Sequence, residues 1–153
     1  MRQVTKEEFK ELYVKLGVQR KNVMLVDNRY GFFCGGFDCL ADHTHFERNT
    51  VTGFNVGGDA GGTVTNSTFV KNAVGAAVGF IFSLRIDRSA FLKNDIGVLA
   101  NGAQVTVSRS LFVKNWTAVR VVAPEGDDYA CARLQRDRFI RNGVNLDGPR
   151  CAV

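Results

Sequence analysis

The sequence lacks the features by which a chain enters or crosses a membrane. Its most apolar run, residues 73–82, is too short to span a bilayer. Its first 20 residues carry too many charges for the apolar core of a secretory signal. We therefore expect a soluble protein without a membrane span, located in the cytoplasm or in a virion or similar assembly.

Cysteine is scarce, and its spacing excludes the common metal and redox motifs. The four cysteines are Cys34, Cys39, Cys131 and Cys151. Four residues separate the first two, not the usual two of zinc and redox sites, and no histidine stands at a ligand spacing from the others. The sequence therefore predicts buried free thiols rather than a metal site or a disulfide, and no cofactor.

Proline and tryptophan are also rare, at two and one, whereas glycine and phenylalanine number 16 and 12. Few prolines mean few rigid breaks, and many glycines leave many positions open to positive φ. The excess of phenylalanine suggests that it fills a recurring slot. With 45% hydrophobic and 23% charged residues, the composition predicts a single globular domain over residues 1–153.

A short phrase recurs five times and supplies that slot. A phenylalanine is followed two residues later by a cation and three residues later by an asparagine. The copies are HFERN (45–49), TFVKN (68–72), AFLKN (90–94), LFVKN (111–115) and RFIRN (138–142). The phenylalanines are 23, 22, 21 and 27 residues apart, a period typical of solenoids. The longest interval contains an insertion of loop composition, residues 123–130.

The segments between these phrases predict strands. Residues before each phenylalanine alternate between apolar and polar, as in VTVSRS (105–110), and a Gly-containing or β-branched run follows each asparagine. No helical stripe is evident after residue 20. Two or three short strands per turn, stacked on those of the next turn, describe an all-β parallel β-helix of about five coils over residues 28–153.

Stacked coils place equivalent residues in columns. We expect the phenylalanines to form an internal stack: Phe46, Phe69, Phe91, Phe112 and Phe139. We expect the asparagines to lie at a turn, because asparagine tolerates the αL backbone and its amide can hydrogen-bond along the column. They are Asn49, Asn72, Asn94, Asn115 and Asn142.

The N-terminal segment differs from the repeats and predicts a capping helix over residues 4–17. Thr5 and Glu8 form a capping box, and Gly17 can end the helix. Its apolar face comprises Phe9, Leu12, Tyr13 and Leu16. Such a helix would cover the first coil, whereas at the other end we expect either the short tail or another chain to cover the last coil.

The phrase xFxKN followed by xxG(V/I) resembles the right-handed parallel β-helix repeats of the pectin-lyase-like group. The resemblance covers roughly residues 28–153. It implies a right-handed solenoid, and it implies one of the functions found in that group, which includes carbohydrate-binding proteins, sugar hydrolases, polysaccharide lyases, epimerases and phage tailspikes. One scaffold supports many functions, so the resemblance predicts the fold better than the activity.

The cation of each phrase is the first candidate for function. These residues are Arg48, Lys71, Lys93, Lys114 and Arg141, which in register would form a line along one edge. Further candidates are Arg88, Arg109 and Arg136, three residues before the phenylalanine, and Arg85 on the neighbouring outward row. With a formal net charge of +5, they predict binding of an acidic polysaccharide or another polyanion, with nucleic acid ranked lower because the aromatics fill the core. The alternative is a charged edge that prevents association of strands.

Candidate catalytic residues gather in residues 27–47. They are His43, His45, Tyr30, Arg29 and Asp42. Uronate lyases and epimerases need a base, an acid and a group that neutralises the carboxylate, and histidine, tyrosine and arginine can fill these roles. The triplet YGF (30–32) resembles the start of the active-site segment of alginate C5-epimerases, but FCG replaces the acidic residue, proline and histidine that follow in that family.

Three functions follow from the sequence. The first is a module that binds an acidic glycan along the basic edge, with sugar processing as an additional activity. The second is a structural component that joins a larger assembly or a second copy through its C-terminal end. The third is a uronate lyase or epimerase.

Overall fold

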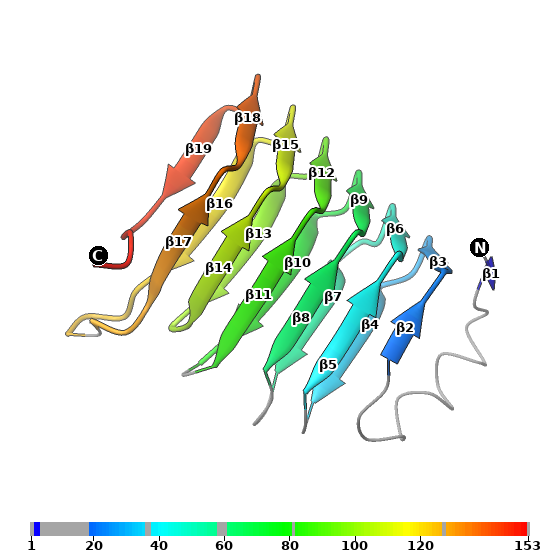
Figure 1. Ribbon diagram of the computed structural model, residues 1–153, viewed down its shortest axis with the longest axis horizontal. Coiled ribbons are helices and arrows are strands. Elements are labelled where there is room, and N and C mark those ends of the chain that lie inside the picture. Colours follow the sequence, from blue (N-terminus) through cyan, green and yellow to red (C-terminus); the bar gives the residue numbers. More distant parts are fainter. Residues whose placement is uncertain are drawn as a thin grey trace.

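The computed structural model describes residues 2–3, 19–35, 38–57, 61–80, 82–126 and 128–152. Within these ranges the regular structure consists of strands, which form three parallel sheets. The protein is therefore an all-β parallel β-solenoid (Figure 1). The predicted capping helix, residues 4–17, lies outside the described residues.

The three sheets run along the length of the molecule. Sheet A contains β1 (Arg2–Gln3), β3 (Val23–Val26), β6 (His45–Glu47), β9 (Thr68–Val70), β12 (Ala90–Leu92), β15 (Leu111–Val113) and β18 (Arg138–Ile140). Sheet B contains β2 (Gln19–Lys21), β5 (Cys39–Asp42), β8 (Gly62–Thr65), β11 (Ser83–Asp87), β14 (Gln104–Ser108) and β17 (Cys131–Gln135). Sheet C contains β4 (Tyr30–Gly35), β7 (Thr52–Gly57), β10 (Val74–Gly79), β13 (Ile96–Asn101), β16 (Thr117–Val122) and β19 (Val144–Asp147).

Each turn of the chain passes through sheet B, then sheet A, then sheet C, as in β5, β6 and β7. Strands carrying the repeated phrase are β6, β9, β12, β15 and β18, and they pair with one another in register. Sheet A extends beyond them through β3 and β1. The predicted number of about five coils, which counts only the phrase, is not confirmed.

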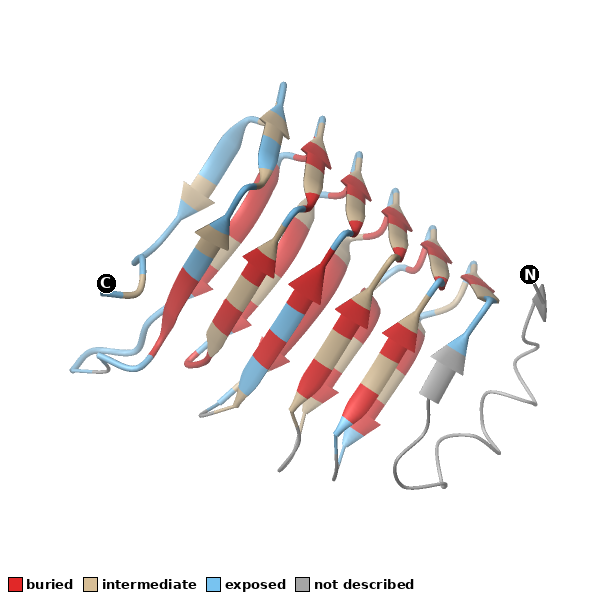
Figure 2. Ribbon diagram, in the orientation of Figure 1, coloured by how far each residue is buried: buried red, intermediate tan, exposed pale blue. Residues whose placement is uncertain are grey.

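The core confirms the predicted phenylalanine column. Consecutive rings from Phe46 to Phe139 are stacked with centroids 4.6, 4.6, 4.8 and 5.1 Å apart. The first four rings are fully buried, and Phe139 at the end of the stack is partly buried. Alternation along each strand points one set of side chains inward, which gives the banded burial in Figure 2.

A second internal column confirms the predicted asparagine ladder. From Asn72 onward, the side-chain oxygen of each asparagine accepts hydrogen bonds from the backbone N–H and side-chain amide of the asparagine one turn earlier, at 2.8–3.1 Å. Each amide also donates to a carbonyl of the preceding turn, such as that of Phe69 for Asn94. The ladder satisfies buried backbone groups at the corner between sheets A and C.

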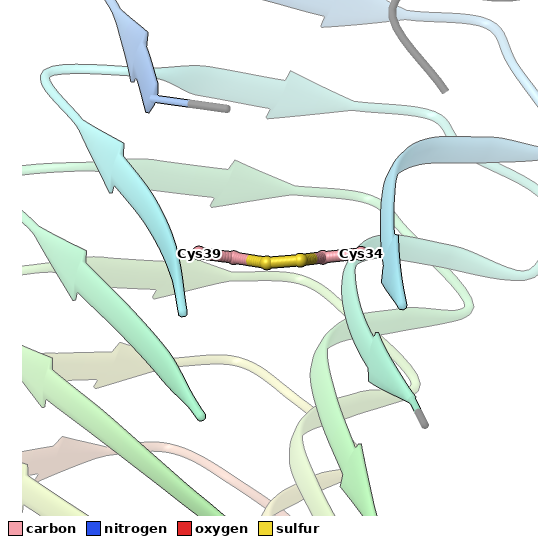
Figure 3. Close-up of a disulfide and its surroundings, with 2 residues drawn as sticks. All are labelled: Cys34 and Cys39. Carbon is pink, nitrogen blue, oxygen red and sulfur yellow. A yellow bond between two sulfur atoms is a disulfide. The ribbon is translucent and has the colours of Figure 1, made fainter. Parts of the chain in front are cut away.

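The prediction of free thiols is wrong, because the described cysteines form two disulfides. Cys34 ends the inward row of β4 and Cys39 begins β5, so the next corner of the chain brings them together across 6.3 Å between Cα atoms (Figure 3). Cys131 and Cys151, with Cα atoms 4.8 Å apart, join β17 to the C-terminal tail. The spacing of cysteines in the sequence does not show which strand ends meet.

The tail covers one of the three sheets at the C-terminal end. Ala132 of β17 donates its N–H to Pro149 and accepts from the N–H of Cys151, both at 3.0 Å, so the tail pairs with sheet B. The last strands of sheets A and C, β18 and β19, have no further strand among the described residues. The predicted tail therefore covers only part of this end.

Candidate functional site

The cations of the repeated phrase lie at the corner between sheets A and C, and each adopts a positive φ. The φ values of Arg48, Lys71, Lys93, Lys114 and Arg141 lie between 51° and 56°. The prediction that asparagine takes the αL conformation is wrong, because the preceding cation takes it instead. The αL residue turns the chain with its side chain outside, and the asparagine then points inward and supplies hydrogen bonds.

The backbone holds the cations in register. The N–H of each of the first four cations donates to a carbonyl of the next turn at 2.9–3.0 Å: Arg48 to Val70, Lys71 to Leu92, Lys93 to Val113 and Lys114 to Ile140. The cations therefore stack at the spacing of paired strands, about 4.8 Å. We call these five residues the A–C cation column.

The N-terminal member of the column is neutralised within the chain. Arg48 makes two hydrogen bonds to the carboxylate of Asp27, at 2.7 and 2.8 Å, and also contacts Glu47. The hydrogen bond to Arg48 lowers the pKa of Asp27, and the pairing raises the pKa of Arg48. Arg48 is therefore poorly placed to bind an external anion.

The three lysines of the column differ from Arg48 in this respect. Lys71, Lys93 and Lys114 are exposed, and none has a carboxylate of the described residues within ion-pair distance. Arg141 is likewise exposed at the last turn. The free positive charge of the column is thus concentrated toward its C-terminal part.

The second predicted cation row lies at the other corner of sheet A, where the chain passes from sheet B. Arg88, Arg109 and Arg136 all have positive φ there. Asp87 pairs with the first two, at 3.0 Å to Arg88 and 2.7 Å to Arg109. Burial acts to raise the pKa of Asp87, but hydrogen bonds from Arg109 and Ser108 and the two positive charges lower it overall.

A shallow depression of about 530 Å³ opens beside this row. Its lining residues are Ser108, Arg109, Gln135 and Arg136. The carboxylate of Asp87 offsets part of the positive charge of Arg88 and Arg109. The corner between sheets B and A therefore carries less unpaired positive charge than the corner with the three lysines. Arg85 was predicted to belong to the same binding surface. It lies on the outer face of sheet B, in register with Thr63 and Thr106, and belongs neither to the A–C cation column nor to the row of Arg88, Arg109 and Arg136.

The candidate catalytic residues fall into three places. His43 contacts Asp42 at 3.0 Å at the corner between sheets B and A. His45 lies within sheet A and contacts Glu47 at 3.2 Å. Arg29 and Tyr30 lie at the corner between sheets A and C, with the Arg29 guanidinium 5.8 Å from the centre of the Tyr30 ring.

Asp42 is held as a carboxylate. It accepts hydrogen bonds from Thr65 at 2.6 Å and Asn66 at 3.0 Å, and with His43 they lower its pKa well below the usual range. A carboxylate so stabilised is a poor general acid or base near neutral pH. Because Tyr30 and Arg29 lie at a different corner, the described geometry brings no acid, base and cation of this set together.

The structure adds two features that the sequence reasoning missed. One is a ladder of hydroxyls at the corner between sheets B and A, in which the backbone N–H groups of Thr44, Ser67 and Ser89 donate to the hydroxyl of the next turn at 3.1–3.2 Å. The sequence pattern that indicates this ladder is a Ser or Thr directly before the first four copies of the repeated phrase. The other is Trp116, which follows the asparagine of its repeat and is 75% exposed. The expectation that the aromatics fill the core and leave few stacking platforms on the surface does not hold for Trp116.

The described residues contain no group of three or more histidine, cysteine or acidic side chains that could hold a metal ion. They also contain no helix with the length and apolar character needed to cross a membrane. No family model, curated protein or solved structure matches the chain. The fold and the arrangement of charge therefore have to carry any functional conclusion.

Proposed function

We propose that the protein binds an acidic polysaccharide along Lys71, Lys93 and Lys114. The observation that carries this proposal is a run of three exposed lysines, one per turn, without carboxylate partners among the described residues. A polymer lying along the solenoid axis would meet one ammonium group per turn. A repeating anion matches this surface better than a single small anion does.

The proposal includes the finer assignment of the fold. We place the solenoid with the right-handed, pectin-lyase-like β-helices, whose members include carbohydrate-binding proteins and sugar-processing enzymes. The stacked phenylalanines and the asparagine ladder support this placement. It favours a glycan over the other polyanions, but it assigns no catalysis.

Disulfides bear on where such binding would occur. Both cysteine pairs are joined, and disulfides persist in oxidising surroundings such as the extracellular space, the periplasm and virion surfaces. They support a virion-associated or extracellular location for the binding surface over the cytoplasm. Acidic polysaccharides are accessible in those surroundings.

The test compares two variants that lose the same charge. Changing Lys71, Lys93 and Lys114 to Gln should weaken binding to alginate and heparin resins by about tenfold, because three exposed ion pairs contribute about 0.5 kcal/mol each. The matched control changes Lys21, Arg133 and Arg150 to Gln, which are exposed cations of sheet B or of the tail paired with it. The salt concentration at elution is measured for both.

The control variant shows whether retention on the resin depends on the three lysines or only on the net charge of the protein. We expect the control variant to elute close to the unmodified protein and the lysine variant to elute at lower salt. Equal shifts in the two variants would show that net charge, and not the A–C cation column, causes retention. Unchanged elution of the lysine variant would refute the proposal.

A second function, assembly through the C-terminal end, has its own supporting observation. The outer edges of β18 and β19 are uncovered among the described residues, and Ile140 and Val144 are 37% and 43% exposed there. Such an end is suited to pairing with another chain. Sedimentation equilibrium tests this, since a protein that stays monomeric at all concentrations would count against self-assembly.

A further inference from the structure

Trp116 is an exposed aromatic at the corner that carries the A–C cation column. It is the only tryptophan of the chain, and 75% of its side chain is exposed. It lies two residues after Lys114, and its backbone N–H donates to the carbonyl of Asn94 on the preceding turn at 3.1 Å. The Trp116 side chain lies outside the internal phenylalanine stack, so the core does not use it.

The positions equivalent to Trp116 on the two neighbouring turns are an aspartate and a glycine. The equivalent position on the preceding turn is Asp95, whose carbonyl accepts the N–H of Thr117. On the following turn it is Gly143, where a Cβ atom would lie 2.7 Å from the carbonyl oxygen of Trp116. A side chain is therefore disfavoured at position 143, so this position leaves the indole uncovered.

We propose that Trp116 is the stacking platform for a pyranose ring of an acidic glycan, whose anionic group pairs with Lys114. The inference rests on the proposed function and names the ligand more closely. The C–H face of a sugar packs on an aromatic face, as apolar groups do. Lys114 lies on the same turn and Lys93 on the turn before, so a second anionic sugar can reach the next lysine.

The carboxylate of Asp95 favours a glycan over a nucleic acid as the ligand. It is an exposed carboxylate beside the column, and no cation of the described residues lies within ion-pair distance of it. The anionic groups of an acidic glycan and the phosphates of a nucleic acid both meet repulsion at this carboxylate, but the glycan also offers it hydroxyl donors on every sugar. Nucleic-acid binding also uses a series of aromatic platforms, whereas Trp116 is the one aromatic in the exposed class among the described residues of this corner.

The single tryptophan gives a direct readout. Titration of the unmodified protein with alginate should change the intensity or wavelength of its fluorescence, which comes from Trp116. Changing Trp116 to Ala should weaken alginate binding, measured by calorimetry, by about tenfold, since loss of one aromatic stacking contact has an effect of this size. Oligo-dT should bind at least tenfold more weakly than alginate under the same salt conditions.

Phe80 supplies the matched control. It is 73% exposed and lies at the corner that follows sheet C, away from the lysines. Changing Phe80 to Ala removes a similar exposed aromatic surface and should leave alginate binding unchanged. Both changes are at exposed side chains, and circular dichroism checks that both variants remain folded.

The outcomes separate this inference from the function on which it rests. If alginate binds through the lysines but neither fluorescence nor the Trp116→Ala change responds, the platform is refuted and the proposed function stands. If neither alginate nor heparin binds, both are refuted. Tighter binding of oligo-dT than of alginate, with a fluorescence change, would refute the glycan and identify the ligand as nucleic acid.

Discussion

Two successive residues have different roles at the corner between sheets A and C: one turns the backbone and the next forms buried hydrogen bonds. Lys93 takes the αL backbone conformation, with φ of 56°, and Asn94 is buried, with 2% of its surface exposed. The αL conformation costs a non-glycine residue about 1 kcal/mol, which the buried hydrogen bonds of the asparagine offset. The lysine side chain takes part in neither effect, so its charge is free to serve binding.

Changing Asn94 to Ala should lower the free energy of unfolding by about 3 kcal/mol. The change leaves the N–H of Asn72 and the carbonyl of Phe69 without their buried partners, and each loss costs about 1–3 kcal/mol. The midpoint of urea denaturation measures it, with the slope unchanged. Asn101→Ala, at the exposed end of β13, is the control. Equal midpoints for the two variants would contradict a stabilising ladder.

At the scale of elements, the three-residue strands of sheet A depend on the phenylalanine stack. A strand such as β12 (Ala90–Leu92) is too short to be stable by itself, and its central residue, Phe91, lies between the rings of Phe69 and Phe112. Stacking along the axis therefore holds together strands that have few hydrogen bonds each. It also fixes the register of the corner cations.

Changing Phe91 to Ala should destabilise the protein by about 3–5 kcal/mol, the usual cost of a cavity left by a buried phenylalanine. The same change at Phe139 should cost clearly less, because that ring is only partly buried and stacks on one neighbour in the column, Phe112. Urea denaturation of the two variants tests the difference. A loss at Phe139 as large as that at Phe91 would indicate that something covers the end of the stack.

At the scale of the whole molecule, two disulfides act near opposite ends of the solenoid. Cys34–Cys39 closes the corner between β4 and β5, and Cys131–Cys151 fastens the tail onto β17. The tail continues sheet B by one short pairing, while sheets A and C end at β18 and β19 in the part of the chain that the structure describes. The Cys131–Cys151 disulfide therefore holds the tail over the C-terminal edge of sheet B and leaves the edges of sheets A and C uncovered by the described residues.

Changing Cys131 and Cys151 together to Ser should lower the free energy of unfolding by about 3 kcal/mol. The bond closes a loop with a sequence separation of 20 residues, and the entropy of that loop in the unfolded chain gives this size. Changing Cys34 and Cys39 to Ser, with a separation of five, should cost about 2 kcal/mol. Thermal unfolding with and without reductant measures both. Alkylation of all four cysteines in unreduced, unfolded protein would contradict the two disulfides.

Much of the solenoid was predictable because its columns repeat in the sequence. The period placed Phe91 and Asn94 in the core and at a turn, and the structure confirms both positions. The chemistry of asparagine suggested αL geometry, but hydrogen bonds to the neighbouring turns favour placing that strain on Lys93. The preference of asparagine for the αL conformation is therefore outweighed by hydrogen bonds that form only between stacked coils.

The period, the strands and the identity of the stacked residues can be read from the amino-acid sequence alone, because each repeats locally at a regular interval. Which charges remain without a partner depends instead on contacts between turns. Arg48 meets Asp27 and Arg109 meets Asp87 across turns more than 20 residues apart, while Lys71, Lys93 and Lys114 meet no described carboxylate. The tertiary structure also decided the cysteine pairing and the exposure of Trp116. Distances between turns depend on how the coils stack, and no local pattern contains them.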